Sequence, residues 1–361
     1  MAQAATLAAF TKGFKDPFED GLREHLRAAT NRVKDLHPAG EELAEVIGEF
    51  SVRGGKRLRP LLVALGYEAY SRSNDWREVL NAAISVELFH AFFLIHDDIM
   101  DRSDLRRGLP TVHRIFEKRF TDQGLVQRAS LTHLSNSMAI LAGDQCCQIA
   151  YDALHMLDMP ENRILRALRH MRQMVEATLI GQVLDMVGFF EQANEELVTN
   201  IQILKTARYS VEAPLHLGMI LADAGPSDLE AISRFAIPAG IAYQITDDLL
   251  GMFGSEEEVG KPVTSDLAEG KETLLTVIFR SRAPRQAQKK FAELHGKSEI
   301  TVEELSDARS LLRAYGAVEY SESRARALVD EAKDSLARTQ LPAVSRNMLA
   351  ELAESFIGRT T

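Results

Sequence analysis

The sequence predicts an all-α protein that folds as one large helical bundle. Apolar residues recur with helical spacing along most of the 361-residue chain, whereas strand-like alternation is hard to find. Proline and glycine breakers separate these stretches, and none of them resembles a flexible interdomain linker. Several predicted helices are apolar over much of their circumference, as expected of a large bundle with a buried centre. We therefore predict a single domain over residues 1–361.

The individual helices follow from the apolar periodicity and from the breakers between them. The breakers are His37-Pro38-Ala39-Gly40, Gly108-Leu109-Pro110, Met159-Pro160, Ala224-Gly225-Pro226-Ser227 and Gly260-Lys261-Pro262. The predicted helices cover about 16–35, 41–52, 57–70, 76–101, 127–157, 160–189, 194–223, 227–250, 271–282, 302–314, 318–337 and 342–357.

Composition limits the partners and the compartment. Hydrophobic residues make up 45% of the chain, enough for a sizeable core, and the formal charge of −10 argues against a general binder of nucleic acid or anionic membranes. The only cysteines, Cys146 and Cys147, are adjacent and poorly placed for a disulfide. From the N-terminal residues we expect no secretory signal, and we expect no apolar run of transmembrane length without interruption. We expect a cytoplasmic protein with no membrane span.

Two carboxylate clusters each follow a long apolar run. The first is Asp97-Asp98-Ile99-Met100-Asp101, and the second is Asp247-Asp248-Leu249-Leu250-Gly251. Because helical residues four apart share a face, Asp97 and Asp101 should present their carboxylates side by side at the end of an apolar helix. Acidic oxygens are costly there unless cations neutralise them, and hard oxygen ligands favour Mg²⁺. The clusters therefore predict magnesium and, with it, a phosphate.

Basic residues accompany both clusters. The first continues into Arg106-Arg107-Gly108, and a Gly-broken loop with Lys261 and Lys271 follows the second. The order of apolar helix, acids and then cations thus occurs twice, which suits a diphosphate held between magnesium and fixed positive charges. A third basic motif, Gly54-Gly55-Lys56-Arg57-Leu58-Arg59-Pro60, precedes an apolar helix and forms a plausible anion cradle. Taken alone, it is equally consistent with a basic surface turn.

Together, these motifs resemble those of the trans-type polyprenyl diphosphate synthases, the head-to-tail prenyltransferases. The matching segments are GGKRLRP, DDIMD with RRG, GQVLD, KTA, YQITDD and GKPVTSDLAEGK, in the family's order from about residue 50 to 275. The resemblance implies an all-α bundle around a central cavity, the isoprenoid synthase type I fold, as a homodimer. It also implies two small-molecule substrates, isopentenyl diphosphate and an allylic diphosphate, which condense through an allylic cation.

The resemblance assigns roles to individual residues. Three Mg²⁺ ions would be bound directly by Asp97, Asp101 and Asp247, with water-mediated help from Asp98 and Asp248. The allylic diphosphate would contact Arg106, Lys205, Lys261 and Lys271. Isopentenyl diphosphate would contact Gly55, Lys56, Arg59, His90 and Arg107. The allylic cation would be stabilised by Thr206 and Gln244.

The chain departs from the family pattern in two places. Gly251 stands where many members carry a third aspartate, which puts the affinity of the third ion in question. The segment LTHLSNSMAILAGDQCC, around Gly143 and Asp144, also differs from the commoner family wording.

Product length depends on two aromatic residues near the first cluster. Phe92 and Phe93 lie five and four residues before Asp97, about 6–7.5 Å along the helix axis. In this family, bulky rings at these positions form a floor that stops the growing chain; otherwise they simply pack the core. We expect farnesyl diphosphate as the product, with geranylgeranyl diphosphate as the alternative. The rival classes are a class I terpene cyclase, a non-catalytic partner subunit and a purely structural bundle.

Overall fold

The computed structural model confirms that the chain is all-α. It describes residues 6–71, 73, 75–124, 128–187, 193–256 and 262–358. Within these ranges the regular structure is helical except for one two-stranded antiparallel hairpin. Contacts between residues divide the chain into two compact units, and the single-domain organisation stays a prediction.

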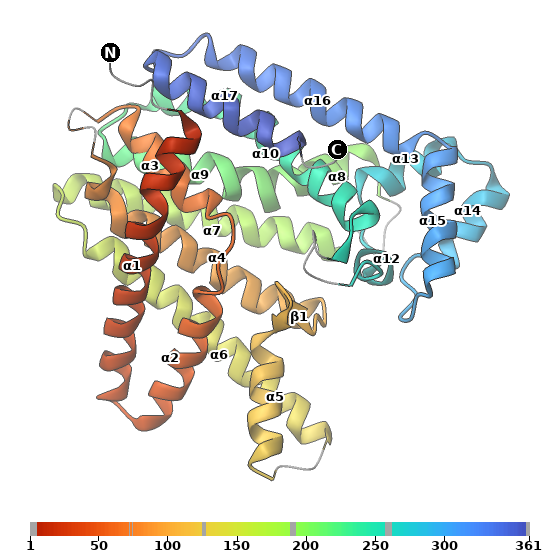
Figure 1. Cartoon of the computed structure of the whole chain (residues 1–361), viewed down its shortest axis with the longest axis horizontal. Helices are drawn as coiled ribbons and strands as arrows, with labels where there is room; N and C mark the ends of the chain where they lie inside the picture. Colours follow the sequence, from red (N-terminus) through yellow and green to blue (C-terminus); the bar gives the residue numbers. More distant parts are fainter. Residues whose placement is uncertain are drawn as a thin grey trace. The chain divides into compact units, whose positions relative to one another are not determined.

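The N-terminal unit comprises Ala8–Leu168 and Leu217–Asp223. Its elements are α1 (Leu7–Lys34), α2 (Pro38–Ser51), α3 (Leu58–Glu68), the 3₁₀ helix η1 (Trp76–Val79), α4 (Leu80–Met100), β1 (Leu105–Arg106), β2 (Leu109–Pro110), α5 (Val112–Asp122) and α6 (Arg128–His155). Helix α4 packs lengthwise against α6 and also contacts α3 (Figure 1). Gly143 of α6 makes room for the ring of His96 on α4, because a Cβ there would lie 2.5 Å from Cε1 of that ring.

Helix α4 is the apolar centre of this unit. The segment Trp76–Met100 is long and apolar enough to cross a membrane by length and composition, although we expected no run of that length. It contains a few polar residues, Glu87 among them, but its mean hydropathy remains as high as that of a membrane-spanning helix. In its most apolar window 67% of the residues are buried inside the protein, as in a core helix of a water-soluble protein.

Two helix predictions in this unit were wrong. Helix α1 begins at Leu7, well before the predicted start at residue 16, because Phe14 and Phe18 continue its buried face despite Pro17. Helix α5 was missed altogether. Its sequence is strongly polar, but Val112 and Phe116 lie one turn apart and are buried together, which stabilises a short helix.

The C-terminal unit comprises Met1–Leu7, Arg169–His216 and Ala224–Thr361. Its elements are α8 (Glu195–Ile201), the π-helix η2 (Gln202–Glu212), α10 (Pro226–Phe253), α12 (Ser265–Glu269), α13 (Leu274–Arg282), α14 (Arg285–Ala292), α15 (Val302–Ala314), α16 (Ala317–Leu336) and α17 (Ala343–Ile357). Two further helices, α7 (Glu161–Val187) and α9 (Ala213–Leu221), contribute residues to both units. Helix α10 is central and packs against η2, α16 and α17.

The predicted continuous helix over residues 194–223 is interrupted by η2. Two glycines on neighbouring helices allow a close approach to the backbone of η2. A Cβ on Gly181 of α7 would lie 2.4 Å from the Lys205 nitrogen, and one on Gly240 of α10 would lie 2.5 Å from the Ala207 Cα. Helices α7 and α10 thus lie against the backbone of η2 with no side chain in between at these two glycines. Turns of the π type are frequent at functional sites. The short helices α12 and α14 were also missed.

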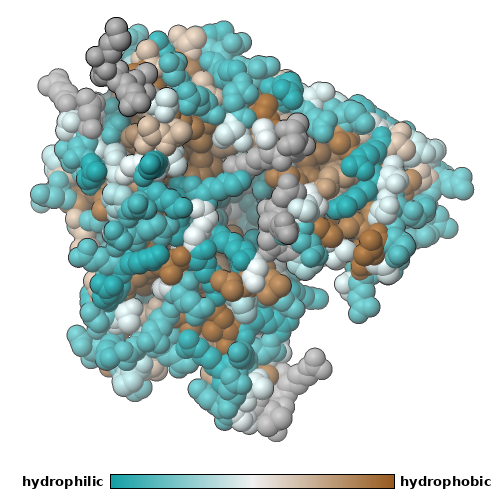
Figure 2. Space-filling view, viewed as in Figure 1, coloured by the Kyte–Doolittle hydropathy of each residue, from teal (hydrophilic) through white to brown (hydrophobic). Residues whose placement is uncertain are grey.

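The surface is of the ordinary kind for a charged globular protein. The face in Figure 2 is largely hydrophilic, with hydrophobic residues gathered in separate patches. This agrees with a composition in which 26% of the residues are charged.

Candidate functional site

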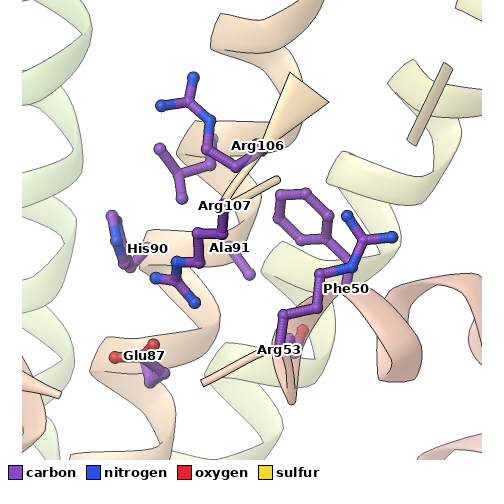
Figure 3. Close-up of a pocket in the computed structure, with 9 residues that line it drawn as sticks. Phe50, Arg53, Glu87, His90, Ala91, Arg106 and Arg107 are labelled. Carbon is purple, nitrogen blue, oxygen red and sulfur yellow. The ribbon is translucent and has the colours of Figure 1, made fainter. Parts of the chain in front are cut away.

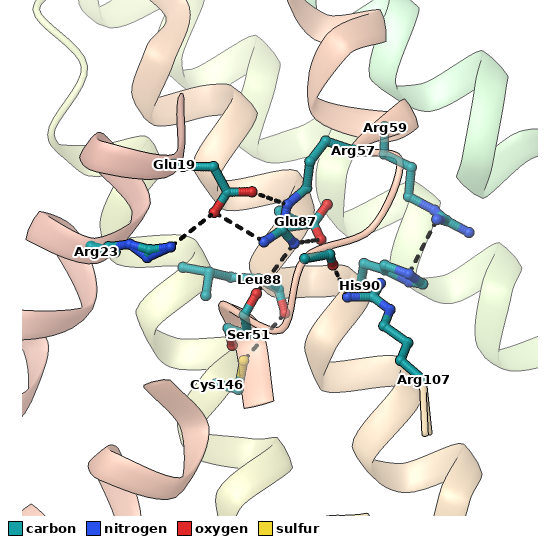
Figure 4. A network of polar contacts seen from close by, with 11 residues as sticks. Glu19, Arg23, Ser51, Arg57, Arg59, Glu87, Leu88, His90, Arg107 and Cys146 are labelled. Carbon is teal, nitrogen blue, oxygen red and sulfur yellow. Dashed lines mark hydrogen bonds and ion pairs between the residues drawn. The ribbon is translucent and has the colours of Figure 1, made fainter. Parts of the chain in front are cut away.

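The backbone of the Gly54–Arg59 motif forms a tight loop beside the hairpin of the N-terminal unit. Gly54 and Gly55 have φ values of 83° and 125°, which glycine adopts readily. A Cβ on Gly55 would lie 3.0 Å from Cζ of Arg107, so the absence of a side chain admits the guanidinium. Arg107 donates a hydrogen bond to the Gly54 carbonyl (Figure 4). The structure therefore brings together Gly55 and Arg107, two of the predicted isopentenyl diphosphate contacts.

The hairpin presents the two arginines of the RRG motif. Residues Leu105–Arg106 and Leu109–Pro110 pair as antiparallel strands, which leaves Arg107 and Gly108 as a two-residue turn. Both turn residues have positive φ, 54° and 73°, the combination required by a type I′ turn. Thus Arg106 projects from the ladder and Arg107 from the turn.

His90 of α4 lies beside this loop. Nη1 of Arg59 and Nε2 of His90 are 3.2 Å apart. Because a guanidinium can only donate, Nε2 must accept, which places the proton of a neutral His90 on Nδ1. Burial and the nearby charges of Arg59, Arg107, Arg106 and Arg57 hold the pKa of His90 well below its usual value, so the ring stays neutral.

These groups line a pocket in the N-terminal unit (Figure 3). Its lining residues are Phe50, Ser51, Arg53, Glu87, His90, Ala91, Leu94, Arg106 and Arg107. Three arginines with one carboxylate give the pocket a positive balance, which suits an anion. Lys56 and Arg59 are carried by the adjoining loop and the first turn of α3, with Lys56 exposed.

The first carboxylate cluster stands at the C-terminal end of α4. Asp101 caps this helix and donates its N–H to the Asp97 carbonyl at 2.8 Å, so the two residues lie one turn apart as predicted. Asp98 is fully buried, and its Oδ1 accepts bonds from Arg106 Nε and Nη2 at 2.9 and 2.5 Å. The other oxygen, Oδ2, is buried without a hydrogen-bond partner.

Burial raises the pKa of Asp98 to about 6. Arg106 opposes this rise, whereas the carboxylates of Asp97 and Asp101 add to it. A buried carboxylate with one unsatisfied oxygen is expensive, and positive charge beside it would stabilise its ionised form. Arg106, predicted to clamp the allylic diphosphate, is therefore held by Asp98 in this structure.

In the C-terminal unit, a hydrogen-bonded chain leads from η2 to the second carboxylate cluster. The Thr206 hydroxyl donates to Oε1 of Gln244 at 2.6 Å, and Nε2 of Gln244 donates to Oδ1 of Asp248 at 2.7 Å. The structure thus brings together the two residues predicted to stabilise the cation. One residue away, Lys205 pairs with Asp185 at 2.6 Å.

The second cluster has more carboxyl groups around it than its own sequence contains. Burial raises the pKa of Asp248 to about 8, and the carboxylates of Asp247, Asp266 and Asp185 add to the rise while Gln244 opposes it. Asp266 also occupies the space beside Gly251, where a Cβ would lie 1.6 Å from its Oδ2. A nearby carboxylate thus stands where a side chain at position 251 would begin.

The remaining predicted residues fall into four groups. Lys271 forms an ion pair with Glu269 at 2.8 Å, just beyond α12. Lys261 lies outside the described residues. Phe92 and Phe93 are half-buried with ring centroids 4.7 Å apart, so they form one aromatic pair on α4. Asp97 and Asp247 belong to different units, and their convergence on one cavity stays a prediction.

The two carboxylate clusters are suited to bind Mg²⁺ if a substrate phosphate supplies further ligands. Among the residues that the structure describes, no three His, Cys, Asp or Glu side chains form a ready-made metal group. Mg²⁺ commonly takes only one or two carboxylates and completes its shell with water and substrate phosphates. The unsatisfied Asp98 Oδ2 and the crowded carboxylates around Asp248 are consistent with such sites.

Sequence reasoning missed three carboxylates. Glu19 and Glu87 bind Arg57 inside the N-terminal unit, and Asp266 adjoins Gly251. Glu87 carried a usable signal, because an acid within the apolar run VELFHAFFLI must find a buried partner. No comparable signal marks Glu19, which lies in an amphipathic helix among other charged residues.

Comparison with known proteins identifies the family. The polyprenyl synthetase family model matches residues 40–312. A geranylfarnesyl diphosphate synthase of Aeropyrum pernix is 34% identical over 85% of this chain and 91% of its own length. A (2E,6E)-farnesyl diphosphate synthase of Mycobacterium bovis is 31% identical over 84% and 80%, respectively.

A solved structure agrees with this result. The geranylgeranyl pyrophosphate synthase of Corynebacterium glutamicum, crystallised with isoprenyl diphosphate and magnesium, has a TM-score of 0.89 and 31% identity. The match covers 95% of this chain and 99% of that one. This chain therefore belongs to the polyprenyl synthetase family and is a prenyltransferase.

Proposed function

We propose that this enzyme condenses isopentenyl diphosphate with an allylic diphosphate to give a short-chain trans-prenyl diphosphate. The observation that carries the proposal is the basic pocket of the N-terminal unit, whose lining includes His90 and Arg107. Arg107 donates a hydrogen bond to the Gly54 carbonyl beside Gly55, and Arg59 from the adjoining helix donates one to His90. A terpene cyclase has no second diphosphate to bind and would not need this pocket. Its position next to the carboxylates at the end of α4 supports a two-substrate reaction.

The residues contribute mainly charge and orientation. Bound Mg²⁺ would neutralise the allylic diphosphate and help it depart, and we assign its direct ligands to Asp97, Asp101 and Asp247. Arg106 and Lys205, now paired with Asp98 and Asp185, would shift to the diphosphate oxygens as negative charge develops there. Lys261 and Lys271 are assigned to the same diphosphate.

Carbon–carbon bond formation needs no side-chain nucleophile. As the allylic C–O bond breaks, the oxygens of Thr206 and Gln244 would face the positive charge that remains on the chain. The double bond of isopentenyl diphosphate then attacks, which forms the new bond and adds five carbons. The proton lost from the adduct passes to the released diphosphate, so charge and atoms balance.

We infer farnesyl diphosphate as the principal product. The observation in support is the Phe92–Phe93 pair, one turn before Asp97 on α4, where it would limit the space below the metal site. Geranylgeranyl diphosphate is the second candidate, because the similar Corynebacterium glutamicum structure is a geranylgeranyl pyrophosphate synthase.

One experiment tests class and product length together. Purified protein is incubated with Mg²⁺, isopentenyl diphosphate and, in separate reactions, dimethylallyl, geranyl or farnesyl diphosphate, and the products are separated by chain length. We expect farnesyl diphosphate from the first two starters and little extension of the third. Hydrocarbon released from farnesyl diphosphate without isopentenyl diphosphate would identify a cyclase, and no turnover of the purified protein alone would favour a non-catalytic subunit.

We also propose that the enzyme is a cytoplasmic homodimer. Helix α7 carries an exposed apolar stripe, with Leu179, Ile180, Val183 and Met186 each 47–55% exposed at helical spacing. A second copy of the chain would cover such a stripe. Light scattering after size-exclusion chromatography should show a dimer, and Val183→Glu should shift it towards the monomer. Both cysteines are free, as expected in a reducing compartment.

A further inference from the structure

The loop that carries Lys56 and Arg59 is held in a conformation that needs support. Arg57, between these two residues, has a φ of 48° and a ψ of 38°, in the left-handed region that side chains other than glycine, asparagine and aspartate seldom adopt. Such strain persists only where the surrounding structure compensates for it. The support must therefore come from contacts of Arg57 itself or of its neighbours.

The Arg57 side chain supplies these contacts by turning into the protein interior. It is 3% exposed, and its Nε and Nη2 bind the two oxygens of Glu19 at 2.7 and 3.2 Å. Nη1 binds Oε1 of Glu87 at 2.5 Å and the Ser51 carbonyl at 3.2 Å (Figure 4). We call Arg57, Glu19 and Glu87 the Arg57 brace. A bidentate arginine–carboxylate contact of this kind fixes orientation as well as distance.

The brace connects the loop to the helix that completes the pocket. Glu87 lies three residues before His90, about one turn away on α4, and His90 accepts the hydrogen bond of Arg59. Arg57 and Arg59 thus anchor the loop to α4 at two successive turns, while Glu19 anchors it to α1. Loss of the brace would remove the contact between the loop and Glu87 of α4 and leave the Arg59–His90 contact in place.

Charge gives the brace a second effect on the pocket. Glu87 is the carboxylate among the pocket's lining residues, and an uncompensated negative charge there would repel a diphosphate. The Arg57 guanidinium, which is not among the lining residues, pairs with Glu87 and offsets this charge. Burial disfavours the charged guanidinium, but its pairing with Glu19 and Glu87 still holds the pKa of Arg57 above its usual value, so this compensation is permanent.

We propose that Arg57, held by Glu19 and Glu87, is a positioning residue that sets the affinity for isopentenyl diphosphate without touching the substrate. The inference rests on the proposed function, which assigns this pocket to isopentenyl diphosphate. It differs from a purely structural role in one respect: the effect should fall on one substrate and spare the other.

The test separates these roles by kinetics. Arg57→Met removes the brace, Arg57→Lys keeps the charge without the bidentate contact, and Glu19→Gln weakens the brace from a residue outside the pocket. We expect Arg57→Met to raise KM for isopentenyl diphosphate about tenfold or more, with KM for the allylic substrate changed less than about twofold. The lysine and Glu19→Gln variants should fall between it and the parent.

A matched control removes a similar arginine elsewhere in the same unit. Arg163 pairs with Asp223 at 3.3 Å and donates to the Leu221 carbonyl at 3.1 Å. Arg163→Met should lower Tm while both KM values stay at those of the parent. Equal changes in the two KM values of the Arg57 variants, or a lower Tm with no change in KM, would overturn the inference. If Arg57→Met does not fold, Glu19→Gln decides by the same criterion.

A binding measurement keeps this result apart from the proposed function. Calorimetry with isopentenyl diphosphate alone reports the pocket without turnover. If the parent binds it but makes no prenyl product, the proposed reaction is wrong while the brace can still be tested through Kd. If the parent and Arg57→Met bind it equally well, the brace has no positioning role.

Discussion

Replacing Gly251 with aspartate would give the second cluster the third carboxylate that many family members carry, yet we expect the change to harm the enzyme. A Cβ at position 251 would lie 1.6 Å from Oδ2 and 2.8 Å from Cγ of Asp266. The backbone fixes the position of the Cβ at residue 251. The carboxylate of Asp266 can therefore avoid the clash only by a change of its own rotamer or by a shift of α12. The new carboxylate would also join Asp247, Asp248 and Asp185 in a region already crowded with carboxyl groups, where each further one is harder to ionise.

The clashing atoms belong to the end of the Asp266 side chain, so the cost depends on how far that side chain can turn away. Forcing additional atoms into a packed site typically costs about 1–3 kcal/mol, which corresponds to a loss of roughly 5- to 160-fold in an affinity or rate constant. Gly251→Ala introduces the same Cβ without charge, so it should show most of the steric part. The aspartate variant should be worse, and its stability without Mg²⁺ should fall because like charges repel.

Kinetics and metal titration check this prediction. We would measure kcat/KM and the midpoint of Mg²⁺ activation for the parent, Gly251→Ala, Gly251→Asp and the double variant Gly251→Asp/Asp266→Ala, with Tm for each. The double variant removes the clash while the number of carboxylates is kept, so it should recover part of the loss. Activity of Gly251→Asp at or above that of the parent would refute the reasoning, since Asp266 could not then occupy that space in the working enzyme.

Three further predictions concern product length, pH and packing. Replacing both Phe92 and Phe93 with alanine should lengthen the prenyl product seen on chromatography. An unchanged product profile would contradict the hypothesis that these two rings stop the growing chain. Burial lowers the pKa of His170 and of His216 from 6.5 to about 4. The free energy of unfolding should therefore fall by up to about 3 kcal/mol for each of these histidines as the pH falls from about 6.5 to about 4. In that range the unfolded state binds more protons than the folded state. Urea unfolding should show this slope reduced in His216→Gln; parallel pH curves would contradict it. Gly240→Ala should lower the free energy of unfolding by about 1–3 kcal/mol, because its Cβ would meet Ala207 Cα at 2.5 Å, whereas Gly48→Ala, with nothing within 4 Å, should not; equal midpoints for these two variants would speak against the packing argument.

The helices that the sequence predicted well are those whose signal is local. Helix α15 begins at a capping box in which Thr301 and Glu304 bind each other's backbone N–H groups at 3.2 and 3.0 Å, and its bounds match the prediction. Helix α10 starts at Pro226 after Gly225, as the breaker indicated. Where packing supplies the stabilisation, as for α5, or the helix is of the π type, as in η2, local patterns were insufficient.

The candidate site shows the same division. The spacing of Asp97 and Asp101 is sufficient to place them one turn apart, because helix geometry is local. The spacing of residues did not predict the partner of Arg106. We expected Arg106 to contact the allylic diphosphate, and the structure pairs it with the buried Asp98. Which cation binds which carboxylate depends on the packing of helices that bring them within reach.

Sequence alone determined the all-α class, the order of the motifs and the chemical type of each group, since these depend on residue identity and on short-range periodicity. Only the tertiary structure decided that Arg107 sits on Gly54, that Arg57 joins Glu19 to Glu87, and that Asp266 adjoins Gly251. Arg107 and Gly54 are 53 residues apart in the chain, and Arg57 and Glu87 are 30 apart. Contacts over such separations form only when whole helices pack, because hydrophobic burial is non-directional and does not specify which polar side chains will meet.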